Sequence, residues 1–156
     1  MSGATPPAAA LLDSNVLVAI CAGEHQHHAA SAALFDAAPR RYAAASHSFA
    51  EAYATLTRRG GTAPFLRSPA DAWTALASLR AAVEIVGLDG LQTVEAIRRY
   101  AASGGTGPRL YDALIGEAAV AHGVPAIVTW NTRHMAGLFP GLEVATPPAF
   151  LAARVG

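Results

Sequence analysis

Short apolar runs alternate with longer amphipathic stretches along most of this chain, and this alternation limits the folds it can adopt. The runs of strand length cover residues 9–13, 42–45, 83–86 and 126–129, with a weaker one at 142–145. The helical stretches cover residues 15–21, 27–37, 48–58, 69–80, 90–102 and 109–122, with a short turn at 132–138. Strands that alternate with helices pair in parallel and carry helices on both faces of the sheet. The pattern predicts a three-layer α/β/α domain around a central, mostly parallel sheet of four to five strands.

Glycine and proline fall between the predicted elements. Gly60 and Gly61 end one helix, and the run Gly123-Val124-Pro125 precedes the strand at 126–129. The loop at 103–108 contains three glycines, but a phosphate-binding loop would also need a lysine after them. We expect this loop to be a hinge, or to become ordered when substrate binds. Nothing divides the chain, so residues 1–156 are expected to form one domain, with residues 1–8 as a flexible lead.

The composition excludes several classes of protein. The content of hydrophobic residues is 53% and that of charged residues 14%, which suits a compact domain and not a disordered chain. No apolar run reaches the roughly 18 to 20 residues that a membrane span requires. No basic segment precedes the first apolar stretch, so we expect no signal peptide and a cytoplasmic protein. The single cysteine, Cys21, cannot form an internal disulfide and is expected to be a small core residue.

All 11 basic residues are arginines, and the chain has no lysine. Any mechanism that needs a catalytic lysine is therefore excluded. The formal net charge is zero, so no overall positive field attracts nucleic acid. The sequence contains three arginine pairs: Arg40-Arg41, Arg58-Arg59 and Arg98-Arg99. Together they could form a basic stripe beside a pocket, but for each pair taken singly a solvated helix end is favoured.

Acidic and amide side chains stand where the predicted strands end or the next helices begin. Asp13 follows an apolar strand directly, and Asn131 follows the strand at 126–129. Glu51 and Asp112 lie in the early turns of their helices. For Glu51 alone an exposed helix position is favoured, whereas for Asp112 alone a helix cap and a metal ligand are equal alternatives. Ligands of parallel sheets bind at the carboxyl ends of the strands. Carboxylates gathered there need a cation, and a divalent metal ion that supports phosphodiester cleavage is the simplest one.

Three segments carry a resemblance to a known family. Residues 11–17 read Leu-Leu-Asp-Ser-Asn-Val-Leu, residues 111–115 read Tyr-Asp-Ala-Leu-Ile, and residues 127–134 read Ile-Val-Thr-Trp-Asn-Thr-Arg-His. In their order and spacing they resemble the PIN-domain nucleases, in particular the VapC-type toxins of bacterial toxin–antitoxin modules. The resemblance extends from residue 11 to residue 150 and implies a PIN-like fold.

The resemblance also implies a set of site residues. It places Asp13, Glu51 and Asp112 in an acidic site for Mg²⁺, with Mn²⁺ as a substitute. The fourth acidic position of the family falls on Asn131, which adds no charge and favours a single metal ion. The remaining expected site residues would orient the carboxylates or the substrate: Ser14, Asn15, Thr129 and Arg133. For Arg133, a surface ion pair is an equal alternative.

The implied function is that of a toxic endoribonuclease from a type II toxin–antitoxin system. It would hydrolyse RNA to 3′-hydroxyl and 5′-phosphate ends and be neutralised by a cognate antitoxin protein, whose helical tail could place an arginine in the acidic pocket. A homodimer is also expected, because the stretches at 31–38 and 48–57 carry much apolar surface. The alternative is a catalytically silent PIN-like module that acts through protein contacts.

Two other enzyme classes fit less well. A phosphotransfer receiver or a haloacid-dehalogenase-like phosphatase would need a lysine, and Asp13-Ser14-Asn15 lacks the second aspartate of the phosphatase. A zinc site would need two histidines four residues apart on a helix or a cysteine partner, which His25, His27 and His28 do not offer. His28 and His134 are instead expected to face substrate or to be merely polar.

Overall fold

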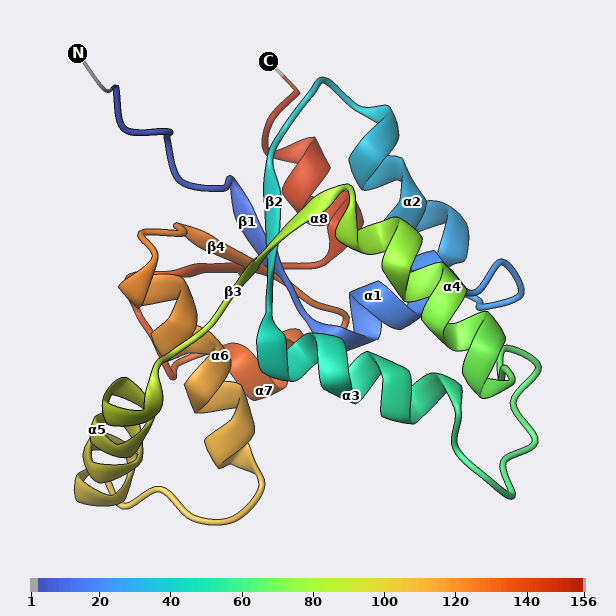
Figure 1. Ribbon diagram of the computed structural model, residues 1–156. Helices are drawn as coiled ribbons and strands as arrows, with labels where there is room; N and C mark the ends of the chain where they lie inside the picture. Colours follow the sequence, from blue (N-terminus) through green and yellow to red (C-terminus); the bar gives the residue numbers. More distant parts are fainter. Residues whose placement is uncertain (1–2, 156) are drawn as a thin grey trace.

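The computed structural model describes residues 3–155, which form one five-stranded sheet with helices on both faces (Figure 1). The strand order is β3-β2-β1-β4-β5, and every neighbouring pair is parallel. The three-layer prediction is confirmed, and the sheet has the upper of the two expected strand numbers. The strands are β1 (Ala10–Leu12), β2 (Tyr42–Ala45), β3 (Val83–Val86), β4 (Ala126–Val128) and β5 (Glu143–Ala145).

The described residues also form eight helices. They are α1 (Ser14–Cys21), α2 (His28–Asp36), α3 (Ser46–Leu56), α4 (Pro69–Arg80), α5 (Gly90–Ala102), α6 (Arg109–Ala121), α7 (Thr132–Met135) and α8 (Pro147–Ala152). The sequence analysis predicted a short turn at 132–138 where the structure has α7, and it did not predict α8. Its signal was present, because Thr146 caps the helix by accepting a hydrogen bond from the Ala149 N–H, and Pro147 occupies the first turn.

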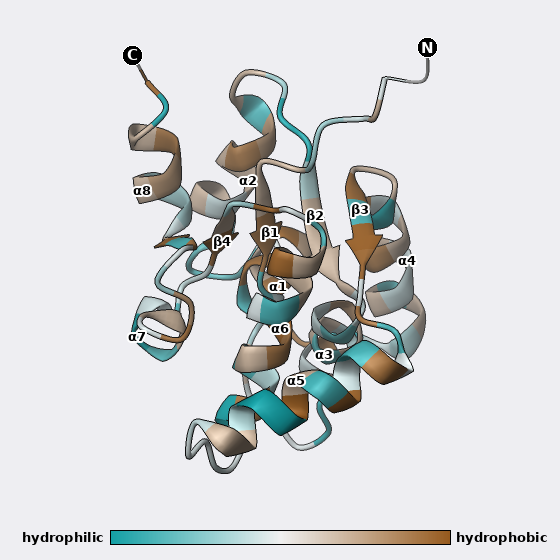
Figure 2. Ribbon diagram, turned by 90° about the vertical axis from the view of Figure 1, so that its left-hand side faces the viewer, coloured by the Kyte–Doolittle hydropathy of each residue, from teal (hydrophilic) through white to brown (hydrophobic). Residues whose placement is uncertain are grey.

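The sheet buries both of its faces because successive residues of each strand point to opposite sides. Leu12 and Ala44 pack with α1, α2, α3, α4 and α8 on one face. Leu11 and Ala43 pack on the other face, mainly against α6 and the residues that follow it. Helix α5 packs against α6 outside this second layer, and Ala96 is its only buried residue. Figure 2 shows brown apolar segments on this outlying helix.

The strand order reverses at β1. The chain builds β2 and β3 on one side of β1, and then crosses back to add β4 and β5 on the other side. In a parallel sheet this reversal opens a crevice at the carboxyl ends of the two strands that flank it. Asp13 follows β1 and Thr129 follows β4, so both residues lie at this edge.

The N-terminal lead is shorter than predicted. Residues 1–2 of the expected lead 1–8 lie outside the described residues. Ala8 is buried, and the Ala9 N–H donates to the Arg41 carbonyl oxygen over 2.8 Å, which ties the chain to the start of β2. The core therefore begins at Ala8. No helix between residues 3 and 155 combines the length and apolar character needed to cross a bilayer.

The arginine pairs and the glycine-rich loop have specific contacts. Arg41 forms an ion pair with Glu84 at 2.7 Å, and Arg99 joins α5 to α6 through Glu117 at 2.7 Å. In the loop at 103–108, the Tyr100 hydroxyl donates to the Thr106 carbonyl oxygen over 3.0 Å. Tyr100 thus anchors a loop that was expected to be a hinge or to order on substrate binding.

Candidate functional site

Asp13 both ends the first strand and begins the first helix. One of its carboxylate oxygens, Oδ1, accepts a hydrogen bond from the Ser14 N–H at 2.7 Å, which caps α1. The other, Oδ2, accepts a hydrogen bond from the Thr129 hydroxyl at 2.8 Å. The side chain is buried, with 6% of the residue exposed. Burial raises the pKa of this carboxyl, the two hydrogen bonds oppose the rise, and the charges of Glu51 and Asp112 add to it.

The Thr129 hydroxyl joins the ends of β1 and β4. It donates to Asp13 and accepts hydrogen bonds from the Asn15 side-chain amide at 3.1 Å and from the Asn131 N–H at 3.0 Å. The side-chain oxygen of Asn15, Oδ1, in turn accepts a hydrogen bond from the Trp130 backbone N–H at 3.0 Å. Ser14, Asn15 and Thr129, expected from the sequence to orient the site, all contact Asp13. This network fixes the position of the Asp13 carboxylate relative to the strand end of β4.

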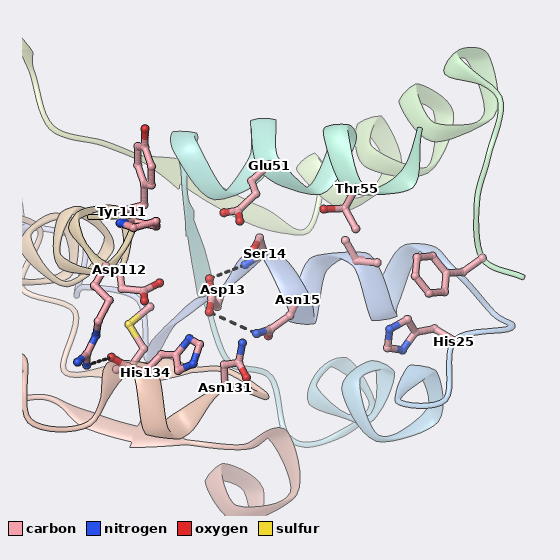
Figure 3. A pocket seen from close by; sticks show the side chains of 15 residues that line it. Asp13, Ser14, Asn15, His25, Glu51, Thr55, Tyr111, Asp112, Asn131 and His134 are labelled. Atoms are coloured by element: carbon pink, nitrogen blue, oxygen red, sulfur yellow. Dashed lines mark hydrogen bonds between the residues drawn. The ribbon is translucent and has the colours of Figure 1, made fainter. Parts of the chain in front are cut away.

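Glu51 and Asp112 lie with Asp13 around one open pocket of about 590 Å³. Glu51 comes from α3 and is exposed, whereas Asp112 comes from the first turn of α6 and is partly buried. Figure 3 shows their side chains and that of Asp13 in the same cavity. Among residues 3–155, no basic side chain forms an ion pair with any of the three carboxylates. The pocket therefore gathers three carboxylates that no ion pair neutralises, although Arg109 also lines it.

The donor set suits a hard divalent cation. Carboxylate oxygens are the ligands that Mg²⁺ and Mn²⁺ prefer. A cation would favour the charged form of Asp13, whose pKa is raised by burial and further by the charges of Glu51 and Asp112. Within the described part of the chain, however, no three His, Cys, Asp or Glu side chains are close enough to hold an ion as they stand. Glu51 is exposed, so its side chain can rotate toward Asp13 without disturbing the core. Holding an ion would therefore require the three carboxylates to move closer together.

The two remaining predicted residues have different positions. Asn131 is exposed, lines the pocket, and makes no capping hydrogen bond with its side chain, which leaves its amide free to face a ligand. Arg133 is exposed and lies outside the pocket lining. Arg109 lines the pocket instead, and its Nη2 donates to the His134 carbonyl oxygen over 2.9 Å. Arg109, and not Arg133, is therefore the arginine that lines the pocket.

Several lining residues were not identified from the sequence. They include His25, Thr55, Phe65 and Tyr111. Tyr111 had a usable signal, because it directly precedes Asp112 at a helix start. His25 and Phe65 belong to loops, for which hydrophobic periodicity carries no information.

The two histidines that were expected to face substrate or to be merely polar lie in different places. His134 lines the pocket, as expected for a residue facing substrate. His28 does not line it, and its Nδ1 lies 2.8 Å from the Ala19 carbonyl oxygen, which gives it a local structural role at the start of α2.

Comparisons with solved structures support the fold. VapC20 of Mycobacterium tuberculosis, a sarcin-ricin loop cleaving toxin, is 16% identical with a TM-score of 0.64, covering 85% of this chain and 97% of that chain. PAE2754 of Pyrobaculum aerophilum is 18% identical with a TM-score of 0.63, covering 96% and 97%. DNA-bound VapBC of Salmonella typhimurium is 19% identical with a TM-score of 0.61, covering 88% and 96%. At these identities the likeness concerns the fold.

The sequence itself decides the family. A comparison with curated proteins gives no match. The PIN domain profile matches residues 10–136, a segment that begins with β1 and ends just after α7. This segment contains Asp13, Glu51, Asp112 and Asn131. The chain belongs to the PIN domain family.

Proposed function

We propose that this PIN domain is a Mg²⁺-dependent endoribonuclease, with Mn²⁺ as a substitute, and the toxin of a type II toxin–antitoxin system. The observation that carries the proposal is the convergence of Asp13, Glu51 and Asp112 on one pocket without a basic partner among residues 3–155. Three carboxylates at the switch point of a parallel sheet repel one another, and a bound divalent cation would offset that repulsion.

The side chains of the pocket have distinct tasks in hydrolysis of a phosphodiester bond. Asp13, Glu51 and Asp112 would hold the ion, which when bound supplies a nucleophilic water and neutralises developing negative charge. Thr129 and the Ser14 N–H keep the Asp13 carboxylate in one orientation. Asn131 lies at the rim, where its amide orients a water or the scissile phosphate. Hydrolysis would leave 3′-hydroxyl and 5′-phosphate ends.

We extend the proposal to a cognate antitoxin protein. A solved toxin–antitoxin complex from Klebsiella pneumoniae shares the fold. The uncompensated acidic pocket would accept an arginine from such a partner, which would compete with the metal ion for the same carboxylates. Induced expression of the chain in bacteria should arrest growth, and Asp13→Asn should relieve the arrest.

We also propose a homodimer, but through a different surface from the one expected from the sequence. The stretches at 31–38 and 48–57 mostly pack inside the protein, and Tyr53 is their only large apolar residue that is exposed. Helix α5 instead leaves Leu91, Val94 and Ile97 exposed at fractions of 84%, 65% and 41%. These residues recur every three positions and form one stripe, which we call the α5 stripe. A second copy of the chain would cover it.

Cleavage of a quenched fluorescent RNA tests the nuclease proposal. Wild-type protein should cleave it with Mg²⁺ or Mn²⁺ and not with EDTA. Asp13→Asn should lower the rate by more than about 100-fold. Loss of a residue that only orients a metal ligand lowers activity by up to about 100-fold, so a larger loss indicates a direct role. Asp36→Asn is the matched control, because Asp36 is exposed at the end of α2 and does not line the pocket.

Calorimetry distinguishes the nuclease from a silent module. Mn²⁺ titrated into the protein should bind, and Asp13→Asn should abolish the binding while the fold survives. A protein that binds no Mn²⁺ and cleaves no RNA would support the alternative, a PIN-like module that acts through protein contacts alone.

A further inference from the structure

The pocket extends beyond its carboxylates in two directions, and each end carries aromatic rings. Figure 3 shows Tyr111 at one end and His25 at the other, with Asp13 and Glu51 between them. At the first end, the Tyr111 ring lies parallel to the His47 ring, with 5.0 Å between centroids and 7° between planes. At the second end, the centroids of the His25 and Phe65 rings are 5.0 Å apart. Flat apolar faces therefore flank the acidic centre on both sides.

Tyr111 lies outside the hydrophobic core clusters, whereas Phe65 packs against one of them and still lines the pocket. Tyr111 is 51% exposed although it lies on the same helix as buried Ile115. His25 and Phe65 are only partly buried, and both line the pocket. An exposed aromatic ring gains little for the fold where it stands, but it offers a nucleobase a face to stack on.

An arginine accompanies each aromatic end. Arg109 lines the pocket beside Tyr111 and uses one guanidinium nitrogen for the His134 carbonyl oxygen. Arg58 lines a smaller adjoining cavity that shares Thr55 and Phe65 with the pocket. Neither arginine forms an ion pair with another residue between 3 and 155. Both can bind a phosphate through their planar guanidinium groups.

We propose that the pocket holds RNA through two base-stacking subsites, one on each side of the scissile phosphate. One base stacks on Tyr111, which His47 supports from behind, and another packs against Phe65 and His25. Arg109 and Arg58 bind the phosphates of these flanking nucleotides. The inference rests on the proposed ribonuclease function and adds the residues that position the strand. The bases that proteins stack on aromatic rings are typically splayed out of unpaired segments, so we infer that the strand in the pocket is unpaired on both sides of the cut.

Abasic nucleotides test the subsites one at a time. A short RNA of defined cleavage position is prepared intact, or with the base removed on the 5′ or the 3′ side of the cut. For wild-type protein, each missing base should lower kcat/KM between roughly 5-fold and 150-fold, the range measured for stacking on aromatic residues. Tyr111→Leu should erase the penalty at one position only, and Phe65→Leu should erase it at the other. A ring with a merely structural role would leave both penalties unchanged.

The control is another exposed aromatic residue. Trp73 is 58% exposed on α4 and does not line the pocket. Trp73→Leu should cleave all three RNAs as wild type does. Thermal unfolding of each variant checks that the fold is intact. If both abasic penalties persist in Tyr111→Leu and Phe65→Leu, or if Trp73→Leu removes them, the subsites are wrong.

Equilibrium binding separates a failure of this inference from a failure of the nuclease function. Fluorescence anisotropy of the same labelled RNAs reports stacking even if the protein cuts nothing. The arginines are tested in the same assay through the slope of log Kd against log salt concentration. Arg58→Gln and Arg109→Gln should each reduce the slope by about 0.7, the value for one phosphate contact on a single strand. Arg80→Gln should not, because Arg80 ends α4 just before β3 and so lies toward the opposite edge of the sheet. Unchanged slopes for Arg58→Gln and Arg109→Gln would contradict the phosphate contacts.

Discussion

At the scale of a single residue, the surroundings of Asp13 act on the pKa of its carboxyl in opposite directions. Two hydrogen bonds stabilise its charged form, whereas burial and the charges of Glu51 and Asp112 favour the protonated form. The balance raises its pKa in the folded protein. Without a cation, the stability gained from a protonated Asp13 is present at low pH and is lost as the pH rises through the folded pKa. A bound divalent ion would reverse that loss at neutral pH.

Thr129→Val should destabilise the protein and weaken the site. The substitution keeps the shape but leaves the Asp13 carboxylate, the Asn15 amide and the Asn131 N–H without their shared partner. We expect the free energy of unfolding in urea to fall by about 1 to 3 kcal/mol and RNA cleavage to fall by roughly 10- to 100-fold. Thr74→Val is the control, since Thr74 is exposed on α4 and should change stability by less than about 0.5 kcal/mol. Equal losses in the two variants would contradict this role for Thr129.

Asn131→Asp should tighten the binding of Mn²⁺. The added carboxylate would face a pocket that already holds three, so it attracts the cation directly and could admit a second ion. Asn131→Ala should instead slow turnover while metal affinity falls only modestly. Calorimetric titration measures both affinity and stoichiometry. If the Asp variant binds no tighter and with the same stoichiometry, Asn131 lies outside the metal site.

Cys21 should react slowly with iodoacetamide in the folded protein. Burial raises the pKa of its thiol to about 11, so little thiolate exists at pH near 8.5. We expect alkylation, followed by mass spectrometry, to be about 100-fold slower than in guanidinium, where the pKa returns to about 8.5. Because the pKa is raised on folding, the associated stability is complete below about pH 8.5 and is lost as the pH rises toward 11. Rapid labelling of the native protein would show that the thiol is not buried in solution.

At the scale of elements, close approach of the segment after α7 to α6 depends on one glycine. A Cβ atom on Gly116 would lie 2.1 Å from the Phe139 ring. Gly116 is buried on α6. The glycine therefore lets Phe139 pack directly on the helix backbone and helps to hold α7 at the rim of the pocket.

Gly116→Ala should lower stability by about 1 to 3 kcal/mol, the usual cost of overpacking, despite the better helix propensity of alanine. Gly90→Ala is the matched control, because Gly90 begins α5 and nothing lies within 4 Å of an added Cβ atom. That variant should be neutral or slightly more stable. Chemical denaturation measures both changes. A Gly116→Ala protein as stable as Gly90→Ala would mean that Phe139 moves aside freely.

At the scale of the whole molecule, the α5 stripe predicts self-association. Sedimentation velocity at micromolar concentration should show a dimer, and Val94→Glu should shift it to a monomer by placing a charge on the stripe. Val155→Glu is the control, since Val155 is 84% exposed near the C-terminus and away from α5. A wild-type monomer, or a dimer that survives Val94→Glu, would remove the stripe as the interface.

Much of the architecture follows from local sequence. The predicted bounds of β2, β3, α4 and α5 match the structure because each has a local signal. The Asp89 carboxylate caps α5 in a capping box with Gln92, and Ser68 with Pro69 begins α4. Asp13 and Asn131 could be assigned to one edge of the sheet from sequence alone. Parallel strands alternating with helices necessarily bring their carboxyl ends together.

Only the tertiary structure decided which other side chains complete the pocket. His25 and Phe65 meet because two loops fold over α1 from distant parts of the chain, and no local pattern encodes that approach. Arg109 lines the pocket and Arg133 does not, and this difference likewise depends on how α6 and α7 pack in the folded protein. The apolar face of α5 remains uncovered because that helix packs on α6 and not on the strands. Local propensities and the parallel sheet place the carboxylates, whereas long-range packing determines what surrounds them.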